Sequence, residues 1–369
     1  MIATPLTYIR QLDGIRAIAV IFVILSHWFP KGIADKFGSG AIGVDIFFVL
    51  SGFLITRILI VERLKYELEP HACSRLKGIK NFIVRRSLRI FPIYYLLLFL
   101  LIIFNKQLPN PVSQDWEWYF FYMQNTLFFI NQAWPGGKLS HLWSLAVEEQ
   151  FYVFWPWLIL FVSRKWLLKS IVISFFIGIV SVYWLTMFKG GTMAGLVTPS
   201  CMHAFAAGGV LAYFHIKKGG DFFHLKYYFL VPALFSFCYL LLGLNGVLPL
   251  FIDTRTIVSI IMLGMISAIL INPNSILAIH ILGNPILVFL GKISYGVYLF
   301  HNFIPTLLNS LLHLLNKRNI EILSMTYNSQ LNEQSILFYF ISFLILLLIS
   351  LISFYFFESK IQKFKIYFT

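Results

Sequence analysis

Long apolar stretches alternate with short polar segments along almost the whole chain. Most of these stretches approach or exceed the length of a helix that crosses a bilayer, which needs about 20 residues. The pattern predicts an all-α, polytopic membrane helix bundle of about ten transmembrane helices. The expected spans are residues 14–30, 41–61, 90–104, 141–162, 170–187, 200–214, 227–243, 255–271, 293–315 and 335–357.

The composition agrees with a membrane protein. Hydrophobic residues make up 59% of the 369 residues and charged residues 12%, with a mean hydropathy of +0.80, whereas soluble domains carry about 25% charged residues. Ten spans leave no room for a sizeable soluble domain. We therefore expect a single integral-membrane domain over residues 1–369, with no appended periplasmic domain after the last span.

The basic residues predict the orientation of the bundle. Placing both termini in the cytoplasm assigns 21 of the 29 Lys and Arg residues to cytoplasmic segments and the other 8 to the outside, as the positive-inside rule requires. This topology accounts for the formal net charge of +14 without nucleic-acid binding, which we do not expect. The three cysteines, Cys73, Cys201 and Cys238, have no metal-ligand spacing, and no metal or bound cofactor is expected.

Two polar residues lie on one face of the first span. Arg16 and His27 are separated by eleven positions, about 20° past three helical turns and about 16 Å along the axis. Asp45 lies near the outer end of the second span, at a depth close to that of His27, where a carboxylate would orient an imidazole and raise its basicity. The alternatives are that Arg16 pairs with Asp13 or extends to the inner surface, and that Asp45 complements a helix dipole.

The third and fourth spans carry further candidates. Arg86 and Arg89 lie three positions apart at the inner mouth of the third span, where two guanidinium groups can clamp a phosphate or simply anchor the helix. In the fourth span, His141, Ser144 and Glu148 form one polar stripe that enters the membrane from outside. Glu149 follows directly. Acidic residues in an apolar span are costly and usually functional.

A weaker stripe occurs in the ninth span, where Ser294, Tyr298 and His301 follow one another at helical spacing and could line a pore. A histidine that is hydrogen-bonded within the bundle is the alternative interpretation of His301.

Five segments in a fixed order carry a resemblance to a known family. They are LDGIRAIAVIFVILSH, GVDIFFVLSGFLIT, RRSLRIFPIYY, HLWSLAVEEQFYVFWP and GKISYGVYLFH. Together they resemble the integral-membrane acyltransferase family three, whose members O-acylate surface polysaccharides, lipopolysaccharide O-antigens, Nod factors and antibiotics. The resemblance extends from about Tyr8 to Glu358.

The resemblance implies roles for particular residues. The family's motifs fall on Arg16 and His27, on Arg86 and Arg89, and on Glu148 and Glu149, with His27 at the position regarded as catalytic. It also implies a bacterial inner-membrane enzyme that takes an acyl group, first of all acetyl, from cytoplasmic acyl-CoA to a carbohydrate hydroxyl outside. We expect His27 to act as a general base or to carry the acyl group itself.

Two other classes stay open. A proton-coupled transporter or flippase of a glycan or small molecule would use intramembrane His and Glu residues as a relay and would move its substrate intact. An unrelated type of membrane O-acyltransferase would centre its chemistry on His301. The sequence leaves open the acyl group, the acceptor glycan, a partner in the final transfer and a homo-oligomeric state.

Overall fold

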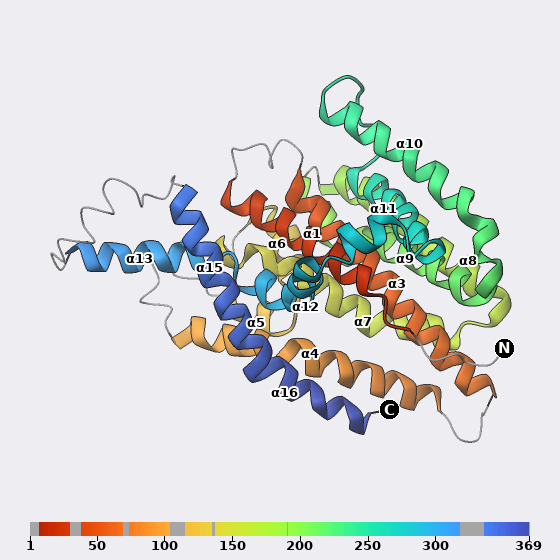
Figure 1. The fold of residues 1–369 in the computed structure, drawn as a ribbon, viewed down its shortest axis with the longest axis horizontal. Coiled ribbons are helices and arrows are strands. Elements are labelled where there is room, and N and C mark those ends of the chain that lie inside the picture. The colour runs from red at the N-terminus through yellow and green to blue at the C-terminus, as the bar shows by residue number, and fades with distance from the viewer. Residues whose placement is uncertain are drawn as a thin grey trace.

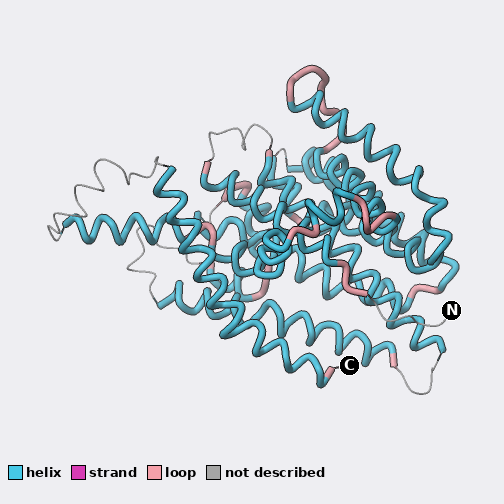
Figure 2. The backbone as a smooth tube through the Cα atoms, viewed as in Figure 1, coloured by secondary structure: helices cyan, strands magenta, loops and turns pink. Residues whose placement is uncertain are grey.

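A computed structural model of the chain describes residues 7–29, 38–68, 74–103, 115–134, 137–189, 191–317 and 336–368. Every regular element in these ranges is helical (Figure 2). The α-helices are α1 (Arg10–Trp28), α3 (Ser39–Leu68), α4 (Arg75–Ile103), α5 (Trp116–Phe120), α6 (Gln124–Asn131), α7 (Trp143–Phe161), α8 (Arg164–Lys189), α9 (Thr198–Lys218), α10 (Lys226–Leu244), α11 (Thr254–Ile271), α12 (Pro285–Phe300), α13 (Ile304–Lys317), α15 (Ile336–Ser353) and α16 (Ser359–Gln362). Short 3₁₀ or π segments are η2 (Gly137–Leu142), η3 (Thr192–Leu196), η4 (Gly219–Leu225), η5 (Leu277–Leu282), η6 (Phe354–Glu358) and η7 (Lys363–Tyr367).

The bundle is built around α3, which packs against α1 on one side and α9 on the other. Helix α12 packs against α1, and α8 packs against α9. In Figure 1, α10 and α11 form the upper right edge, whereas α13 and α15 extend to the left. This arrangement brings the N-terminal helix α1 beside α12 and places the polar residues of both in the interior.

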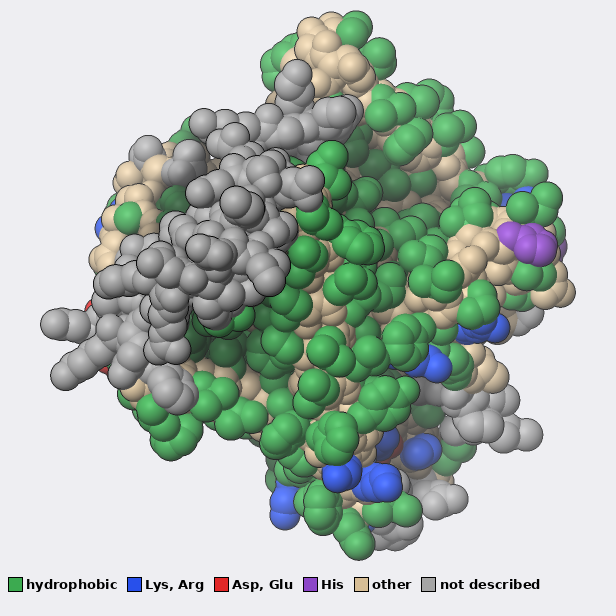
Figure 3. Space-filling view, turned by 60° about the vertical axis from the view of Figure 1, so that its left-hand side comes forward, with side chains coloured by type: hydrophobic (Ala, Val, Ile, Leu, Met, Phe, Trp, Pro, Cys, Tyr) green, Lys and Arg blue, Asp and Glu red, His purple; other side chains and the backbone are tan. Residues whose placement is uncertain are grey.

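Each of the ten expected spans falls on a helix, so the predicted fold class is confirmed. Among the described residues, seven helices are long and apolar enough to cross a membrane, or eight if the bent pair of α12 and α13 is one span. The other two, α7 and α9, have 19 and 21 residues. Polar residues such as Glu148, Glu149 and Gln150 lower the mean hydropathy of α7, and more than half of the residues of α7 and of α9 are buried. Figure 3 shows the outer surface as a broad apolar area with Lys and Arg side chains gathered at one end.

Two spans differ from the prediction in ways that affect the site. The third helix begins at Arg75 and not near residue 90, so Arg86 and Arg89 lie within a long helix and not at its mouth. The ninth span is broken: α12 and α13 are bent by 60° with respect to each other. The break falls on residues 301–303, which are turn residues, and helical spacing alone does not reveal it.

Close contact between α3 and α9 depends on two glycines. A Cβ atom on Gly52 would lie 2.0 Å from the carbonyl oxygen of Phe205, and one on Gly208 would lie 2.1 Å from that of Val49. Small residues permit this approach of helix backbones inside a membrane. The close helix packing that the sequence predicts at Gly52 is confirmed, and it fixes α3 against α9.

Candidate active site

Three histidines from three separate segments meet at one end of the bundle. The ring centroids of His27 and His301 are 4.9 Å apart, those of His141 and His301 are 4.8 Å apart, and those of His27 and His141 are 6.5 Å apart. His141 and His301 are buried, whereas His27 is exposed. The exposed imidazole is therefore the one that a molecule arriving from this end can reach.

The break after α12 builds this cluster. His301 lies where the helix stops, and its Nδ1 is 2.6 Å from the carbonyl oxygen of Tyr298. The backbone carbonyl of His301 accepts a hydrogen bond of 3.0 Å from the indole of Trp28, the residue that follows His27. Irregular backbone inside a membrane protein is tolerated where protein groups satisfy it or where it lines a cavity. This bond also fastens the end of α1 to the break.

The contacts of His27 fix its tautomer. Its Nδ1 is 2.9 Å from the carbonyl oxygen of Val23, and because a carbonyl only accepts hydrogen bonds, Nδ1 carries the proton. Nε2 then presents a lone pair, and it has no hydrogen-bond partner among the described residues. His27 is thus arranged to accept a proton or to act as a nucleophile at Nε2.

His141 is held rigidly beside this base. The carbonyl oxygens of Lys138 and Leu299 lie 3.1 and 3.2 Å from its two ring nitrogens. Asn302, the next residue after His301, donates to the same Lys138 carbonyl at 3.0 Å. His141 therefore connects the segment before α7 to the break after α12.

A chamber lies directly below the histidines, and the polar stripes predicted from sequence meet in it. Ser144, Ser294 and Tyr298 all line this chamber. The hydroxyls of Ser144 and Tyr298 are 2.5 Å apart, and Tyr298 also donates to the carbonyl oxygen of His141 at 2.8 Å. These two hydroxyls lie at the end of the chamber that is nearest to the histidine cluster.

The adjacent glutamates face different cavities. Glu148 lines the chamber, where its carboxylate accepts hydrogen bonds from Ser51 at 3.1 Å and Tyr152 at 2.8 Å. Glu149 instead lines a separate, mainly apolar groove between α4, α7 and α9, and its buried Oε1 has no hydrogen-bond partner among the described residues. The structure therefore brings Glu148, but not Glu149, into the chamber below the histidines.

The other end of the chamber is basic. Arg16, Arg86 and Arg89 line it. Arg16 forms an ion pair with Asp13 at 2.5 Å, as one interpretation of the sequence predicts. Arg86 and Arg89 have no ion pair among the described residues. Two unpaired guanidinium groups in a protein interior are costly unless an anion is bound to them.

The same two arginines line a second cavity beneath the chamber, which we call the vestibule. It has a volume of about 280 Å³, compared with about 90 Å³ for the chamber. Besides Arg86 and Arg89, the vestibule is lined by Lys65, Arg85 and Lys365. The two cavities therefore adjoin at Arg86 and Arg89, with the larger and more basic one on the side away from the histidines.

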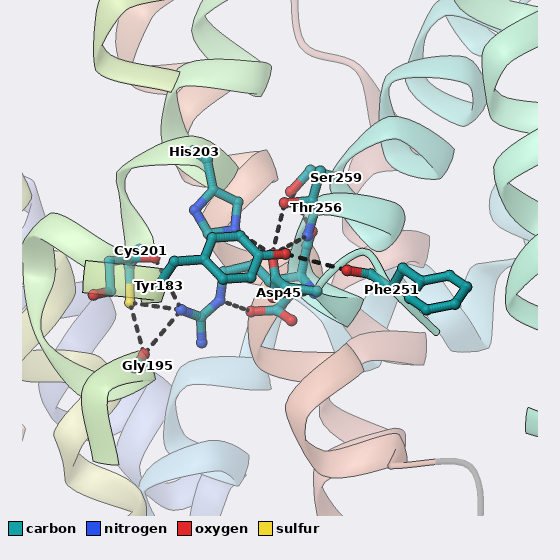
Figure 4. A network of polar contacts seen from close by, with 11 residues as sticks. Asp45, Tyr183, Gly195, Cys201, His203, Phe251, Thr256 and Ser259 are labelled. Atoms are coloured by element: carbon teal, nitrogen blue, oxygen red, sulfur yellow. Dashed lines mark hydrogen bonds and ion pairs between the residues drawn. The ribbon is translucent and has the colours of Figure 1, made fainter. Parts of the chain in front are cut away.

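The expected contact between Asp45 and His27 is not formed. Asp45 is buried and instead pairs with Arg255 of α11, with 2.5 Å between carboxylate oxygen and guanidinium nitrogen (Figure 4). The same guanidinium donates to the carbonyl oxygens of Gly195 and Ser200. Asp45 lies on the side of α3 that faces α11. An argument from its expected depth in the membrane alone therefore assigns it the wrong partner.

This polar network continues to the start of α11. Asp253 caps that helix by accepting from the backbone N–H groups of Arg255 and Thr256, and its Oδ2 lies 3.3 Å from Nε2 of His203. Burial raises the pKa of Asp253, but contacts with His203, Thr256 and Arg255 more than offset this and hold it below its ordinary value. The network joins α3, α9 and α11 and stands apart from the histidine cluster.

With this geometry established, comparison with known proteins identifies the family. Residues 9–355 match the family described as the acyltransferase domain. The chain belongs to this family. The match covers nearly the whole chain and includes all three histidines, the chamber and the vestibule arginines. The resemblance seen in the five sequence segments is confirmed.

Curated relatives of this acyltransferase domain carry related names. It is 37% identical over 199 residues to the peptidoglycan O-acetyltransferase OatA of Listeria monocytogenes, covering 49% of this chain and 29% of that protein. It is 29% identical over 323 residues to a Staphylococcus aureus protein named provisionally as an O-acetyltransferase, covering 80% of this chain and 50% of that protein. The chain thus spans half or less of the length of these relatives. No solved structure matches it significantly. The family and the apolar helices together indicate an integral-membrane member of the acyltransferase-domain family.

The site also contains residues that the sequence does not single out. Tyr152 lies one helical turn after Glu148, a spacing that predicts their contact once Glu148 is a candidate. Lys365 counts only as one cytoplasmic charge among many, and nothing in its local sequence links it to Arg86 and Arg89. Arg255 lies at the start of an apolar run. A charged residue there predicts a buried partner of opposite charge, but the sequence does not identify that partner.

Proposed function

We propose that the chain transfers an acetyl group from cytoplasmic acetyl-CoA to a hydroxyl group of a carbohydrate on the outer side of the bacterial cytoplasmic membrane. The observation that carries this proposal is the route through Arg86 and Arg89. It leads from a basic vestibule, through a narrow chamber, to the hydroxyls of Ser144 and Tyr298 beneath the histidine cluster.

The shape and charge of this route suit a CoA thioester. The phosphates of the nucleotide would remain in the vestibule with the arginines, which bind phosphate bidentately. The thin pantetheine arm, on the order of 15–20 Å long and comparable to a helix rise of ten to thirteen residues, would pass through the chamber. The thioester would then lie at its far end, near His27.

The residues present support direct transfer. The acceptor hydroxyl approaches from the exposed side of His27, and its oxygen attacks the thioester carbonyl while Nε2 of His27 removes its proton. The carbon–sulfur bond then breaks, the CoA thiolate leaves, and the proton on His27 passes to that sulfur. The products are an O-acetyl ester and free CoA, so no other reactant is required.

The class of acceptor follows from the relatives. A protein named peptidoglycan O-acetyltransferase is 37% identical over about half of this chain, which favours a cell-wall or other surface glycan as the acceptor. The distribution of basic residues supports the proposed orientation, because the positive-inside rule favours a cytoplasmic vestibule and histidines on the outer side.

Release of CoA by the purified chain tests the proposal against transport. The chain would be reconstituted in proteoliposomes with acetyl-CoA on the vestibule side and peptidoglycan fragments on the other. We expect free thiol to appear in step with O-acetylated glycan. Movement of intact glycan without thiol release would instead favour the transporter class.

A further inference from the structure

The C-terminal residues form part of the vestibule. After η6, the chain continues as α16 and η7, which lie beside α4 (Figure 1). Lys365 and Phe368 line the vestibule together with residues of α3 and α4. These C-terminal residues follow the family match, which ends at residue 355, so the family resemblance assigns them no role.

The vestibule holds far more positive than negative charge. Among the described residues, its only acidic lining residue is Glu62, and the ammonium group of Lys65 lies 3.8 Å from the Glu62 carboxylate. Four further basic lining residues have no ion pair among the described residues: Arg85, Arg86, Arg89 and Lys365. Glu358 is near Lys365 and Arg89 but does not line the cavity, and its Oε1 accepts a hydrogen bond from Ser353.

Like charges held together repel one another, and a ligand of opposite charge relieves that repulsion. Lys365 is close enough to Arg85, Arg86 and Arg89 for its charge to be affected by all three. Its Nζ donates to the side chain of Gln362 at 3.0 Å, which directs the ammonium group without neutralising it. The vestibule is therefore arranged for a polyanion and not for a single carboxylate.

We propose that Lys365 is a donor-binding residue that contacts the phosphates of the acyl-CoA nucleotide, so that the segment Ser359–Tyr367 forms one side of the donor site. This inference rests on the proposed function, because it takes acyl-CoA as the donor. The nucleotide is the only part of that donor with a dense negative charge, and the width of the vestibule relative to the chamber retains it there.

The test measures transfer kinetics of the full chain in phosphatidylcholine vesicles with two donors, acetyl-CoA and S-acetylpantetheine, which has no nucleotide phosphates. The variant is Lys365→Gln. The matched control is Lys363→Gln, an exposed lysine two positions earlier that does not line the vestibule. Repeating the assay with phosphatidylglycerol added separates contact with the donor from contact with anionic lipid.

We expect Lys365→Gln to raise the KM for acetyl-CoA roughly tenfold, the size expected for loss of a charged hydrogen bond, with kcat almost unchanged. The KM for S-acetylpantetheine should not change, and Lys363→Gln should resemble the unaltered chain with both donors. Equal effects on both donors, or an effect seen only with phosphatidylglycerol, would overturn the inference. Absence of transfer by the unaltered chain with either donor would instead contradict the proposed function.

Discussion

The imidazole rings of His27 and His301 meet edge to face, with their centroids 4.9 Å apart. They belong to the first and ninth expected spans, and the sequence treats them as the centres of two different hypotheses. The break after α12 brings them into one cluster, so both residues belong to one candidate site. His27 is exposed and His301 is buried, and the proposed mechanism therefore gives contact with the acceptor to His27.

Replacing His301 should slow the reaction without weakening donor binding. His301→Ala removes the ring against which His27 packs but keeps the backbone carbonyl that binds Trp28. We expect kcat to fall roughly 10- to 100-fold, at or below the lower limit of a full acid–base contribution, because His301 supports the base and does not itself take the proton; the KM for acetyl-CoA should change less than about twofold. Steady-state kinetics would show this, with the exposed His280 replaced by Ala as control. An unchanged kcat would mean that His301 only fills space.

Glu148 and Glu149 are adjacent in sequence but face different cavities, so substitution of Glu149 is a matched control for substitution of Glu148. Glu148→Gln puts an amide where Ser51 and Tyr152 both donate to a carboxylate, so one of the two hydroxyls loses its acceptor and the chamber loses a negative charge. We expect kcat/KM to fall at least about tenfold, equivalent to about 1.4 kcal/mol. Glu149→Gln, which changes the separate groove, should stay within about twofold. A larger effect at Glu149 than at Glu148 would contradict the placement of the chamber.

The arginines shared by the two cavities should control the requirement for donor. Arg89→Gln removes a guanidinium group with no ion pair among the described residues, and a charged hydrogen bond contributes about 1.5–3 kcal/mol. We therefore expect the KM for acetyl-CoA to rise at least about tenfold, with a smaller change in kcat. Lys80→Gln, at an exposed position on the same helix, is the control. An unchanged donor requirement would leave Arg89 as a membrane anchor only.

Loss of the ion pair between Asp45 and Arg255 should lower the stability of the fold more than it lowers the rate of transfer. Removing one partner of a buried ion pair costs about 3–5 kcal/mol, so Asp45→Asn and Arg255→Met should each lower the thermal midpoint of the purified chain. The double variant should lose less than the sum of the two single losses, because it leaves no unpaired charge.

The pH dependence of transfer separates the two possible roles of Asp45. If Asp45 oriented His27, its loss would shift the pH profile of transfer, because the basicity of His27 would change. The network in Figure 4 predicts that the profile keeps its shape in Asp45→Asn protein that remains folded. A shifted profile with an unchanged thermal midpoint would place Asp45 beside His27 after all.

The sequence predicts the helices well because hydrophobic length is a local property. All ten expected spans are helical, and the motif residues Arg16, Arg86, Arg89 and Glu148 line one chamber, as their helical faces suggest. The contact between Arg16 and Asp13 could also be predicted, because the two residues lie three positions apart on one helix. Properties that depend on a single helix are therefore accessible from the sequence.

Contacts between side chains on different helices are harder to predict from the sequence. The sequence predicts a similar depth for Asp45 and His27, but Asp45 pairs with Arg255, because the rotation of α3 about its axis is not determined by the hydrophobic pattern. The break at residues 301–303 depends on bonds from Trp28 and His141, which come from distant segments. The vestibule position of Lys365 likewise depends on how the C-terminal residues pack beside α4.

The most direct test of the central claim is acetyl transfer across the membrane at His27. Inverted membrane vesicles that contain the intact chain or His27→Ala protein at equal abundance would receive radiolabelled acetyl-CoA on their exposed cytoplasmic face. We predict label on membrane glycan only where His27 is present, because Nε2 of His27 is the base at the far end of the route. Equal labelling by His27→Ala vesicles would contradict both the base and the acyl-carrier role of His27.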